Sequence, residues 1–471
     1  MQKLRVRWAG WLVPGTAALA LGLLAPPPAG AQAPVPVGGE FQVNTYTTFN
    51  QSAPSVAADV DGDFVVVWTG PGIQGQRYAS NGSIQGAQFQ VNTHTTSLQL
   101  YPSVAADVDG DFVVVWMSTG SFGTDTSGWS IQGQRYASDG STQGTQFQVN
   151  TYTYHYQALP SVAVAPGGDF VVTWDSYRSS GTDTSLYSVQ AQRYASNGST
   201  QGAQFQVNTY TTYHQRNPSV AADADGDFVV AWISLGSFGT DAAFTCFYCG
   251  YSIQGQRYAS DGSNQGSEFQ VNSYALGHQL RPSVAVAPAG NFVVAWDSFG
   301  SFSTDHSSYS IQGQRFASDG STQGTQLQVN TYTTNFQGIP SVTSAADGDF
   351  VVVWHSGGSS GTDTSSASIH GRRYASNGST QGGQLQVNTY TTGGQGNPSA
   401  ALAPSGNFVV AWVSSGSPGT DTSGDSIQGQ RYSVPAAAVP AQVPAMSLTT
   451  RFALAAALLL LGATYALRRR A

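Results

Sequence analysis

The chain has 471 residues, among them 55 glycines, and only 9% of its residues are charged. Its formal net charge is −8, but seven of the 18 Lys and Arg residues lie in the two terminal segments, whereas all 26 acidic residues lie between these segments. Such an acidic body repels phosphate backbones, so we expect no nucleic acid among the partners.

The N-terminus has the pattern of a secretory signal peptide. Three basic residues within the first seven precede an apolar stretch at 8–24, and small residues follow at 29–31. Because signal peptides are cut after small residues, we expect cleavage after Ala31. Residues 1–31 are therefore predicted to direct export of the protein.

A tetrapeptide, Phe-Gln-Val-Asn or Leu-Gln-Val-Asn, occurs seven times along the chain. Its copies begin at Phe41, Phe89, Phe147, Phe205, Phe269, Leu327 and Leu385. Successive copies are 48, 58, 58, 64, 58 and 58 residues apart. A repeat of this length is typical of propeller blades or solenoid units.

Each repeat unit contains four short segments typical of β-strands. In the second unit these are 102–106, 112–116, 131–136 and 147–150, which are rich in Val, Ile, Phe, Tyr and Trp and are separated by Gly, Asp or Asn. Between the third and fourth strands, six units have Asp-Gly or Asn-Gly, a pair that favours a two-residue hairpin turn. The first residue of this pair is Asn81, Asp139, Asn197, Asp261, Asp319 or Asn377.

The two ends of the repeat array complement each other. A lone fourth strand at 41–44 precedes the first unit, and the last unit stops after its third strand at 427–432. A closed ring pairs these two strands and leaves no sheet edge open, whereas a linear solenoid needs polar capping units that this chain lacks. We therefore predict an all-β, seven-bladed β-propeller of four-stranded antiparallel blades at 40–432, closed by the N-terminal strand.

The second strand of every unit contains one Trp at an equivalent position. These residues are Trp68, Trp116, Trp174, Trp232, Trp296, Trp354 and Trp412. Because a propeller strand is packed on both of its sides, we expect all seven Trp side chains to be buried between neighbouring blades.

The C-terminus has the pattern of a membrane-associated segment. A linker rich in Pro and Ala is expected at 433–447, and the final segment, 448–471, contains sixteen uncharged residues at 452–467 followed by three arginines. This stretch is shorter than the roughly 20 residues of a comfortable membrane span. The basic triplet predicts a cytoplasmic C-terminus, with the propeller on the other side of the membrane.

The sequence Val-Pro-Ala-Met-Ser at 443–447, followed by an apolar segment and terminal arginines, resembles the bacterial PEP-CTERM and IPTL-CTERM sorting signals. The body is similar to Gly-Asp-Phe-Val-Val-Val-Trp and Gln-Arg-Tyr/Phe repeats of bacterial surface proteins. The resemblance implies an exported protein that is anchored in the membrane or, after C-terminal processing, released to the cell surface or beyond. Its expected partners then include the export and sorting machinery and the inner membrane.

Three units contain Asp-x-Asp-Gly-Asp between the first and second strands. The residues are Asp59, Asp61 and Asp63; Asp107, Asp109 and Asp111; and Asp223, Asp225 and Asp227. Such loops offer oxygen ligands to Ca²⁺, but they also form plain β-turns, and 165–169 fills the same place without three carboxylates. We expect no cofactor, with Ca²⁺ at these turns as the alternative.

The only two cysteines, Cys246 and Cys249, lie in the longest unit. Two cysteines alone do not form a four-ligand zinc site, and the βαβ context of a redox Cys-x-x-Cys motif is missing. Since export favours oxidation, we expect a local disulfide.

The predicted meander gives the propeller one face of tight turns and another of long loops. We expect any ligand on the second face, where aromatic rings among amides suit a glycan or an extended peptide. The candidate residues are Tyr46, Tyr152, Tyr210, Tyr274, Tyr332, Tyr390, Gln51, Gln99, Gln157, Gln215, Gln279, Gln337 and Gln395. In the alternative interpretation, the Tyr rings pack between blades and the Gln side chains bond to loop backbone.

Few residues have the pattern of catalytic groups. The only glutamates are Glu40 and Glu268, most Asp residues lie in repeated turns, and the seven His residues show no metal-ligand spacing. Glycoside hydrolysis needs a carboxylate pair in an asymmetric site. We therefore expect no enzyme and no catalytic or metal-binding residues, but a non-catalytic binding or structural module for an extracellular glycan or protein. The alternative is a carbohydrate-active propeller, either a hydrolase or a lyase.

Overall fold

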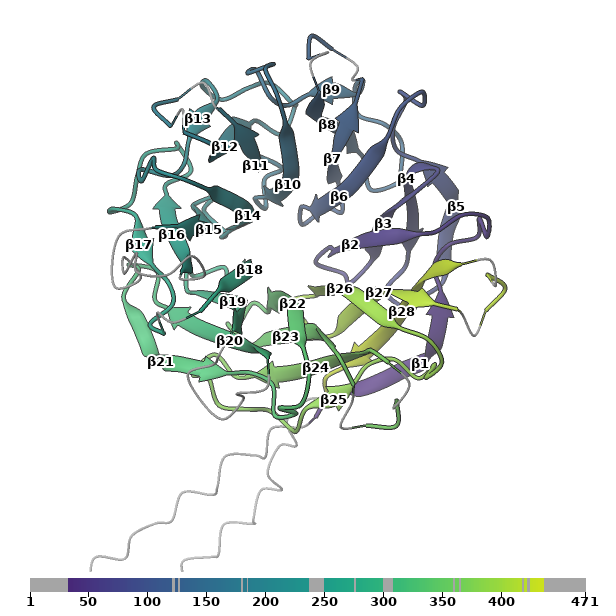
Figure 1. Ribbon diagram of the computed structural model, residues 1–471. Coiled ribbons are helices and arrows are strands. Elements are labelled where there is room, and N and C mark those ends of the chain that lie inside the picture. Colours follow the sequence, from purple (N-terminus) through teal and green to yellow (C-terminus); the bar gives the residue numbers. More distant parts are fainter. Residues whose placement is uncertain are drawn as a thin grey trace, which may run out of the picture. The chain divides into compact units, whose positions relative to one another are not determined.

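The computed structural model describes residues 33–435, apart from 121–122, 126–127, 179–180, 184, 237–249, 275–276, 300–307, 359–360, 364–365, 417–418 and 422–423. The described residues form 28 β-strands and no helix. The strands are arranged in seven four-stranded sheets that stand as blades around a central axis (Figure 1). The predicted all-β, seven-bladed propeller is confirmed.

Each blade runs from an inner strand at the axis to an outer strand at the periphery of the ring. Blades 1 to 7 are numbered in the order of their inner strands. The inner strands are β2 (Ser52–Ala58), β6 (Gln99–Ala106), β10 (Gln157–Val164), β14 (Gln215–Ala222), β18 (Gln279–Val286), β22 (Gln337–Ser344) and β26 (Gln395–Leu402). The second strands are β3 (Phe64–Gly70), β7 (Phe112–Thr119), β11 (Phe170–Tyr177), β15 (Phe228–Leu235), β19 (Phe292–Phe299), β23 (Phe350–Ser356) and β27 (Phe408–Ser415). The third strands are β4 (Gly72–Tyr78), β8 (Trp129–Tyr136), β12 (Tyr187–Tyr194), β16 (Tyr251–Tyr258), β20 (Tyr309–Phe316), β24 (Ser368–Tyr374) and β28 (Asp425–Ser433). The outer strands are β5 (Ile84–Gln90), β9 (Phe147–Gln148), β13 (Phe205–Gln206), β17 (Phe269–Gln270), β21 (Thr322–Gln328), β25 (Leu385–Gln386) and β1 (Val35–Gln42).

The N-terminal strand β1 closes the ring. It pairs antiparallel with β28, with Phe41 opposite Gly429, and thus supplies the outer strand of blade 7. The pairing continues beyond β1, because the backbone N–H of Val43 donates to the carbonyl of Ile427 at 2.8 Å. The predicted closure is confirmed, and β1 begins earlier than predicted, at Val35, and contains a β-bulge.

The hydrophobic core lies between neighbouring blades. In one of seven similar clusters, Trp116 of blade 2 packs with Val65 and Val67 of blade 1. The ring of Phe112 stacks on that of Tyr136, with the ring centres 4.8 Å apart. All seven Trp side chains of the second strands are fully buried, as the sequence predicts.

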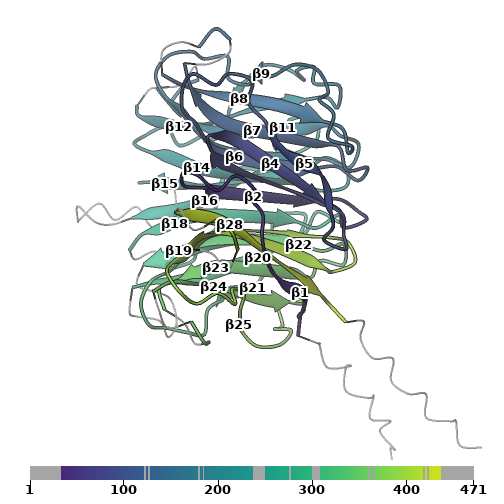
Figure 2. The same cartoon turned by 90° about the vertical axis from the view of Figure 1, so that its right-hand side faces the viewer.

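One face of the ring, the turn face, carries the connections from first to second and from third to fourth strands, while the strands run across to the opposite face (Figure 2). The predicted two-residue hairpin turns are three-residue loops instead. In blade 1, the N–H of Ala79 donates to the carbonyl of Ser83 at 2.8 Å, and only Gly82 has a positive φ. Asn81 instead caps the loop by accepting the N–H of Ser83. Because only one residue of this loop requires a left-handed backbone, a single glycine is sufficient.

Candidate functional site

The face opposite the turns, the loop face, carries the connections from second to third strands and from outer strands to the next inner strand. The seven Gln residues predicted as ligand candidates lie here and are buried. The Oε1 atom of each Gln accepts a hydrogen bond from the Nε1 of the Trp in its own blade, at 2.8–3.2 Å. These Gln side chains therefore hold the core, and their contact with a ligand stays an untested prediction.

The six Tyr residues predicted as ligand candidates lie in the connections from outer to inner strands. Tyr46 is exposed and the other five are half-buried. The backbone carbonyl of each Tyr accepts the side-chain amide of the Asn two residues earlier, at 2.9 Å. This bond fixes the backbone and leaves part of each ring accessible, so ligand contact by these rings also remains a prediction.

The inner strand of every blade has a β-bulge near the loop face. In each bulge the residue before Pro adopts a positive φ of 49–56°. These rim residues are Ala53, Tyr101, Leu159, Asn217, Arg281, Ile339 and Asn397. A left-handed backbone at a residue other than Gly costs on the order of 1–3 kcal/mol, and both bulges and such strain concentrate near functional sites. This ring of strained positions was not predicted from the sequence.

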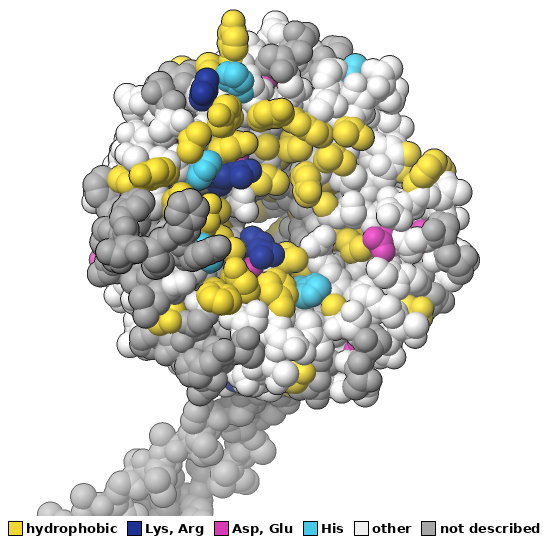
Figure 3. Space-filling view, viewed as in Figure 1, with side chains coloured by type: hydrophobic (Ala, Val, Ile, Leu, Met, Phe, Trp, Pro, Cys, Tyr) yellow, Lys and Arg dark blue, Asp and Glu magenta, His cyan; other side chains and the backbone are white. Residues whose placement is uncertain are grey.

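The rim residues share one backbone conformation but differ in side chain. They are partly or fully exposed and range from Ala53 to Arg281. On this face, Arg, His and hydrophobic side chains gather around the central hollow (Figure 3). The turn face, in contrast, carries nearly the same Gly and Asp residues in each unit. Ligand specificity requires side chains that differ between the repeat units, and such side chains lie at the centre of the loop face. This region is therefore the candidate site.

A buried carboxylate joins blades 3 and 4 at this site. Asp175 directly follows the core residue Trp174 in β11 and is fully buried. Its Oδ2 lies 3.1 Å from Nε of Arg216 in β14, and its Oδ1 accepts the N–H of the rim residue Asn217 at 2.7 Å. The guanidinium carbon of Arg216 lies 4.1 Å from the ring centre of Tyr187, a cation–π contact.

Blades 5 and 6 form a second, similar cluster, in which the arginine and the aspartate belong to the same blade. Asp297, at the position equivalent to Asp175, is also fully buried, and its Oδ2 lies 2.8 Å from Nε of the rim residue Arg281. Its Oδ1 accepts the N–H of Ile339 at 3.1 Å. The guanidinium of Arg281 lies 5.5 Å from the ring centre of Phe336.

Both aspartates have strongly shifted acidity. Burial raises the pKa of Asp175 and of Asp297 to about 7, because a low-dielectric interior disfavours the charged carboxylate. The neighbouring Arg216 and Arg281 oppose this shift only in part. Burial also lowers the pKa of His355, and the charge of Arg281 lowers it further. The site thus holds two carboxyl groups that exchange a proton near neutral pH, a property common among catalytic acids and bases.

These shifts predict a pH-dependent stability. The folded-state pKa of each Asp lies above its value of about 3.9 in an unfolded chain. The stabilisation of the folded state by each protonated carboxyl group is therefore fully present at low pH and is lost as pH rises through 7. Between pH 6 and pH 8 we expect the free energy of unfolding to fall by about 1.4 kcal/mol per Asp. Urea denaturation should show that D175N/D297N lacks this component and that the exposed-site control D139N retains it. Equal pH slopes in D175N/D297N and D139N would contradict the assignment.

Asp175 and Asp297 were not predicted as site residues from the sequence, because most Asp residues lie in repeated turns. A signal existed: both follow a core Trp, at a position where the other five blades have different residues. Those residues are Thr69, Met117, Ile233, His355 and Val413. An acidic residue at a position that is buried in nearly every unit indicates a special role.

The Asp-x-Asp-Gly-Asp segments form closed turns. The Oδ1 atom of Asp59 accepts the N–H groups of Asp61 and Asp63, each at 2.9 Å. Asp63 in turn accepts the N–H of Ser80 in the neighbouring hairpin loop at 2.8 Å. Within the described part of the chain, no three His, Cys, Asp or Glu residues are grouped so as to hold a metal ion. Binding of Ca²⁺ stays untested.

The two glutamates lie in outer strands or beside them and bond to neighbouring connections. The Oε2 atom of Glu268 accepts the N–H of Thr209 at 2.7 Å, and Glu40 makes the same bond to Thr389 at 2.6 Å. Gln146 does so in blade 2, where it accepts the N–H of Thr93. Both glutamates thus replace a Gln that connects adjacent blades.

Three predictions concern residues outside the described part of the chain. They are the disulfide between Cys246 and Cys249, the signal peptide at 1–31 and the apolar segment within 448–471. Among the described residues, no helix of the length and apolarity needed to cross a membrane occurs.

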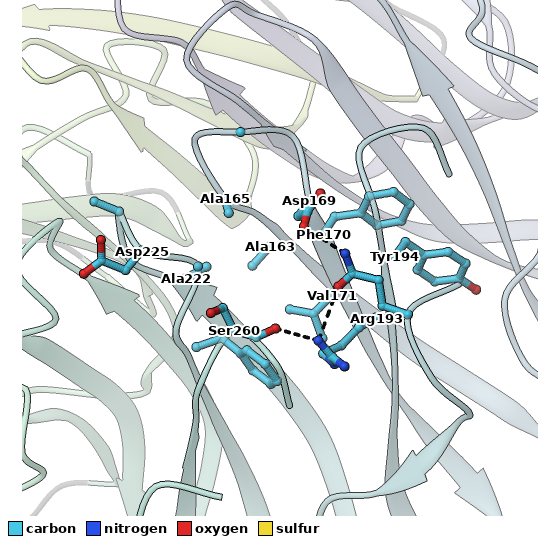
Figure 4. Close-up of a pocket in the computed structure, with 15 residues that line it drawn as sticks. Ala163, Ala165, Asp169, Phe170, Val171, Arg193, Tyr194, Ala222, Asp225 and Ser260 are labelled. Atoms are coloured by element: carbon cyan, nitrogen blue, oxygen red, sulfur yellow. Dashed lines mark hydrogen bonds between the residues drawn. The ribbon is translucent and has the colours of Figure 1, made fainter. Parts of the chain in front are cut away.

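Clefts between blades open on the turn face. The cleft between blades 3 and 4 has a volume of about 250 Å³ and is lined by residues that include Asp169, Arg193 and Ser260 (Figure 4). Nη1 of Arg193 donates to the carbonyl of Ser260 at 2.5 Å and to Oε1 of Gln201 at 3.3 Å. Similar clefts lie between other blades. Because these clefts repeat around the ring, they belong to the fold and do not mark one distinct site.

No protein-family model and no curated protein matches the chain. Several solved structures resemble it in fold. A protein of unknown function from Dyadobacter fermentans has a TM-score of 0.50 at 11% identity, over 73% of this chain and 97% of that one. The α-L-arabinofuranosidase Arb93A of Fusarium graminearum has a TM-score of 0.46 at 12% identity, over 71% and 92% of the two chains. The α-L-arabinanase of Penicillium chrysogenum has a TM-score of 0.44 at 11% identity, over 84% and 98%. At such identities the likeness shows the propeller fold alone.

The expectation that the protein is not an enzyme is corrected: glycoside hydrolases are among the proteins with this propeller fold, so the fold does not exclude an enzyme. The physical premise of that expectation also fails. It placed the Asp residues mostly in repeated turns, whereas Asp175 and Asp297 are buried at two of seven equivalent positions that follow the core Trp. A repeat protein can thus hold an acidic residue at only some of its equivalent positions.

Proposed function

We propose that the protein is a carbohydrate-active propeller that binds a glycan over the centre of the loop face and cleaves it there. The observation that carries the proposal is the pair of buried carboxyl groups, Asp175 and Asp297, each beneath a partly exposed arginine. Cleavage of a glycosidic bond by hydrolysis uses one carboxyl group as proton donor and a second as base or nucleophile. Asp175 lies in blade 3 and Asp297 in blade 5, and we assign to each the role of proton donor within its own cluster.

The acidity of the two groups supports this assignment. A carboxyl group with a pKa of about 7 retains its proton in part of the molecules at neutral pH and gives it up readily, as a general acid must. Arg216 and Arg281 separate the two carboxyl groups from solvent. A glycan that draws these guanidinium groups outward opens a path between its glycosidic oxygen and the carboxyl groups.

The surroundings support a sugar as the ligand. Tyr187 and Phe336 flank the two arginines, and the rim residue Tyr101 is exposed on the same face. Flat aromatic surfaces beside a few polar groups are typical of glycan sites. The signal-peptide pattern at 1–31 supports an extracellular glycan as the substrate.

Hydrolysis assays on purified arabinan, galactan, xylan and pectin test this function. We expect D175N and D297N each to lower kcat by about 100-fold or more, the usual contribution of general acid–base catalysis. The control D139N makes the same change in an exposed loop of the turn face and should leave kcat unaltered. Thermal denaturation verifies that each variant is folded.

Two results would contradict the proposal. One is that the wild-type protein releases no reducing or unsaturated ends from any of these glycans. The other is that an activity present in the wild type survives in the folded D175N/D297N variant.

A further inference from the structure

We propose that the glycan is acidic, and that Arg216 and Arg281 bind the carboxylates of its uronic acid residues. This inference rests on the proposed function, since it concerns the same site. It adds the chemical class of the ligand, which neither the fold nor its structural neighbours indicate.

The two arginines are held with one edge free. Nε of each lies 2.8–3.1 Å from a buried aspartate, and the guanidinium group lies over the ring of Tyr187 or near that of Phe336. Their side chains are 35% exposed, and their terminal nitrogens make no hydrogen bond to any described residue. A planar guanidinium fixed in this way presents two parallel N–H donors, which match the two oxygens of a carboxylate.

The charge of each arginine is only partly neutralised by the aspartate beneath it. Near pH 7 a substantial fraction of Asp175 and Asp297 is protonated, which leaves a net positive charge at the surface. A neutral sugar gains little from that charge, whereas a carboxylate gains both the charge and the paired hydrogen bonds. This favours an anionic ligand over a neutral one.

The acidic residues of the body lie where they do not oppose such a ligand. The exposed acidic residues that the structure describes all lie on the turn face: Asp61, Asp109, Asp139, Asp169, Asp225, Asp261, Asp319 and Asp347. The aspartates of the loop-face loops are buried instead: Asp125, Asp183, Asp363 and Asp421. Because salt screens charges beyond about 8 Å, the remote turn face hardly repels an anion at the loop face. The strongly negative net charge thus does not exclude a polyanionic glycan.

The two arginines act on one extended ligand. Arg216 lies in blade 4 and Arg281 in blade 5, so two adjacent inner strands carry them on the same face. A chain that bears a carboxylate on each sugar can contact both at once. Two linked contacts strengthen each other, since the second forms within the same complex.

Calorimetric titration with oligogalacturonate and with its fully methyl-esterified form tests the inference. The two ligands share the sugar backbone and differ in charge, so the wild-type protein should bind the free acid at least tenfold more tightly. We expect R216Q and R281Q each to raise the Kd for the free acid about tenfold and R216Q/R281Q about 100-fold. R216K/R281K, which keeps the charge but loses the planar fork, should fall between these values.

The matched control is R193Q, which changes an arginine in the turn-face cleft and should leave the Kd unchanged. Thermal denaturation verifies that the variants are folded. Equal affinity of the wild type for the acid and its ester would overturn the inference, as would full affinity for the acid in folded R216Q/R281Q.

The outcome is separable from that of the proposed function. If a neutral glycan is bound and cleaved while the free acid is not bound, the inference fails and the proposed function stands. If the free acid binds through the two arginines and no glycan is cleaved, the ligand class stands and the catalytic proposal fails.

Discussion

Removal of residues 33–44 should lower the free energy of unfolding by roughly 6 kcal/mol, because these residues supply the outer edge of blade 7. Val43 is fully buried in the cluster between blades 7 and 1, and Phe41 packs against the same cluster. Oδ1 of Asn44 accepts the N–H of Ile427 at 2.8 Å. Removal of Asn44 leaves this buried N–H without that partner. Burial of two large apolar side chains contributes about 2 kcal/mol each, and the lost hydrogen bonds account for the remainder.

Urea denaturation of a chain that begins at Ala33, compared with one that begins at Thr45, measures this loss. A synthetic peptide of residues 33–44 should restore stability to the shorter chain in a concentration-dependent manner, because it can add as the missing strand. A scrambled peptide of the same composition serves as the control. Unchanged stability of the shorter chain would show that β1 is not needed for closure.

The fold could be predicted from the sequence because each unit repeats the same local information. The nearly continuous apolar run Phe-Val-Val-x-Trp is typical of a strand packed on both sides, and its seven copies make the pattern clear. The lone strand at 41–44 revealed closure because an unpaired sheet edge is unfavourable. The exact loop type was not predictable from Asn-Gly alone, since this pair suits both two-residue and three-residue hairpin loops.

The candidate site was less accessible to sequence analysis. The bulges of the inner strands were signalled by a Pro within each strand, since Pro cannot donate to a sheet, but the positive φ of residues such as Tyr101 and Ile339 depends on the strand beside them. Asp175 and its partner Arg216 are 41 residues apart and meet only when blades 3 and 4 pack together. The pKa shift of Asp175 arises from that packing, so no local pattern contains it.

Replacement of a core Trp should be nearly as destabilising as removal of β1. We expect W232A to lower the free energy of unfolding by about 3–5 kcal/mol, because its ring is fully buried between blades 3 and 4 and its loss leaves a cavity. The Oε1 atom of Gln215, which accepts the Trp232 Nε1–H at 3.2 Å, would also lose its donor. Urea denaturation followed by far-ultraviolet circular dichroism measures the change.

The matched control is Y154A, which removes an aromatic ring that is 68% exposed on the loop face. Its effect should stay within about 0.5 kcal/mol, as for most surface substitutions. W232F should fall between the two, since it fills part of the cavity but cannot donate to Gln215. A loss below 1 kcal/mol in W232A would mean that neighbouring blades repack around the gap, and the Trp would then not be an essential contact between blades.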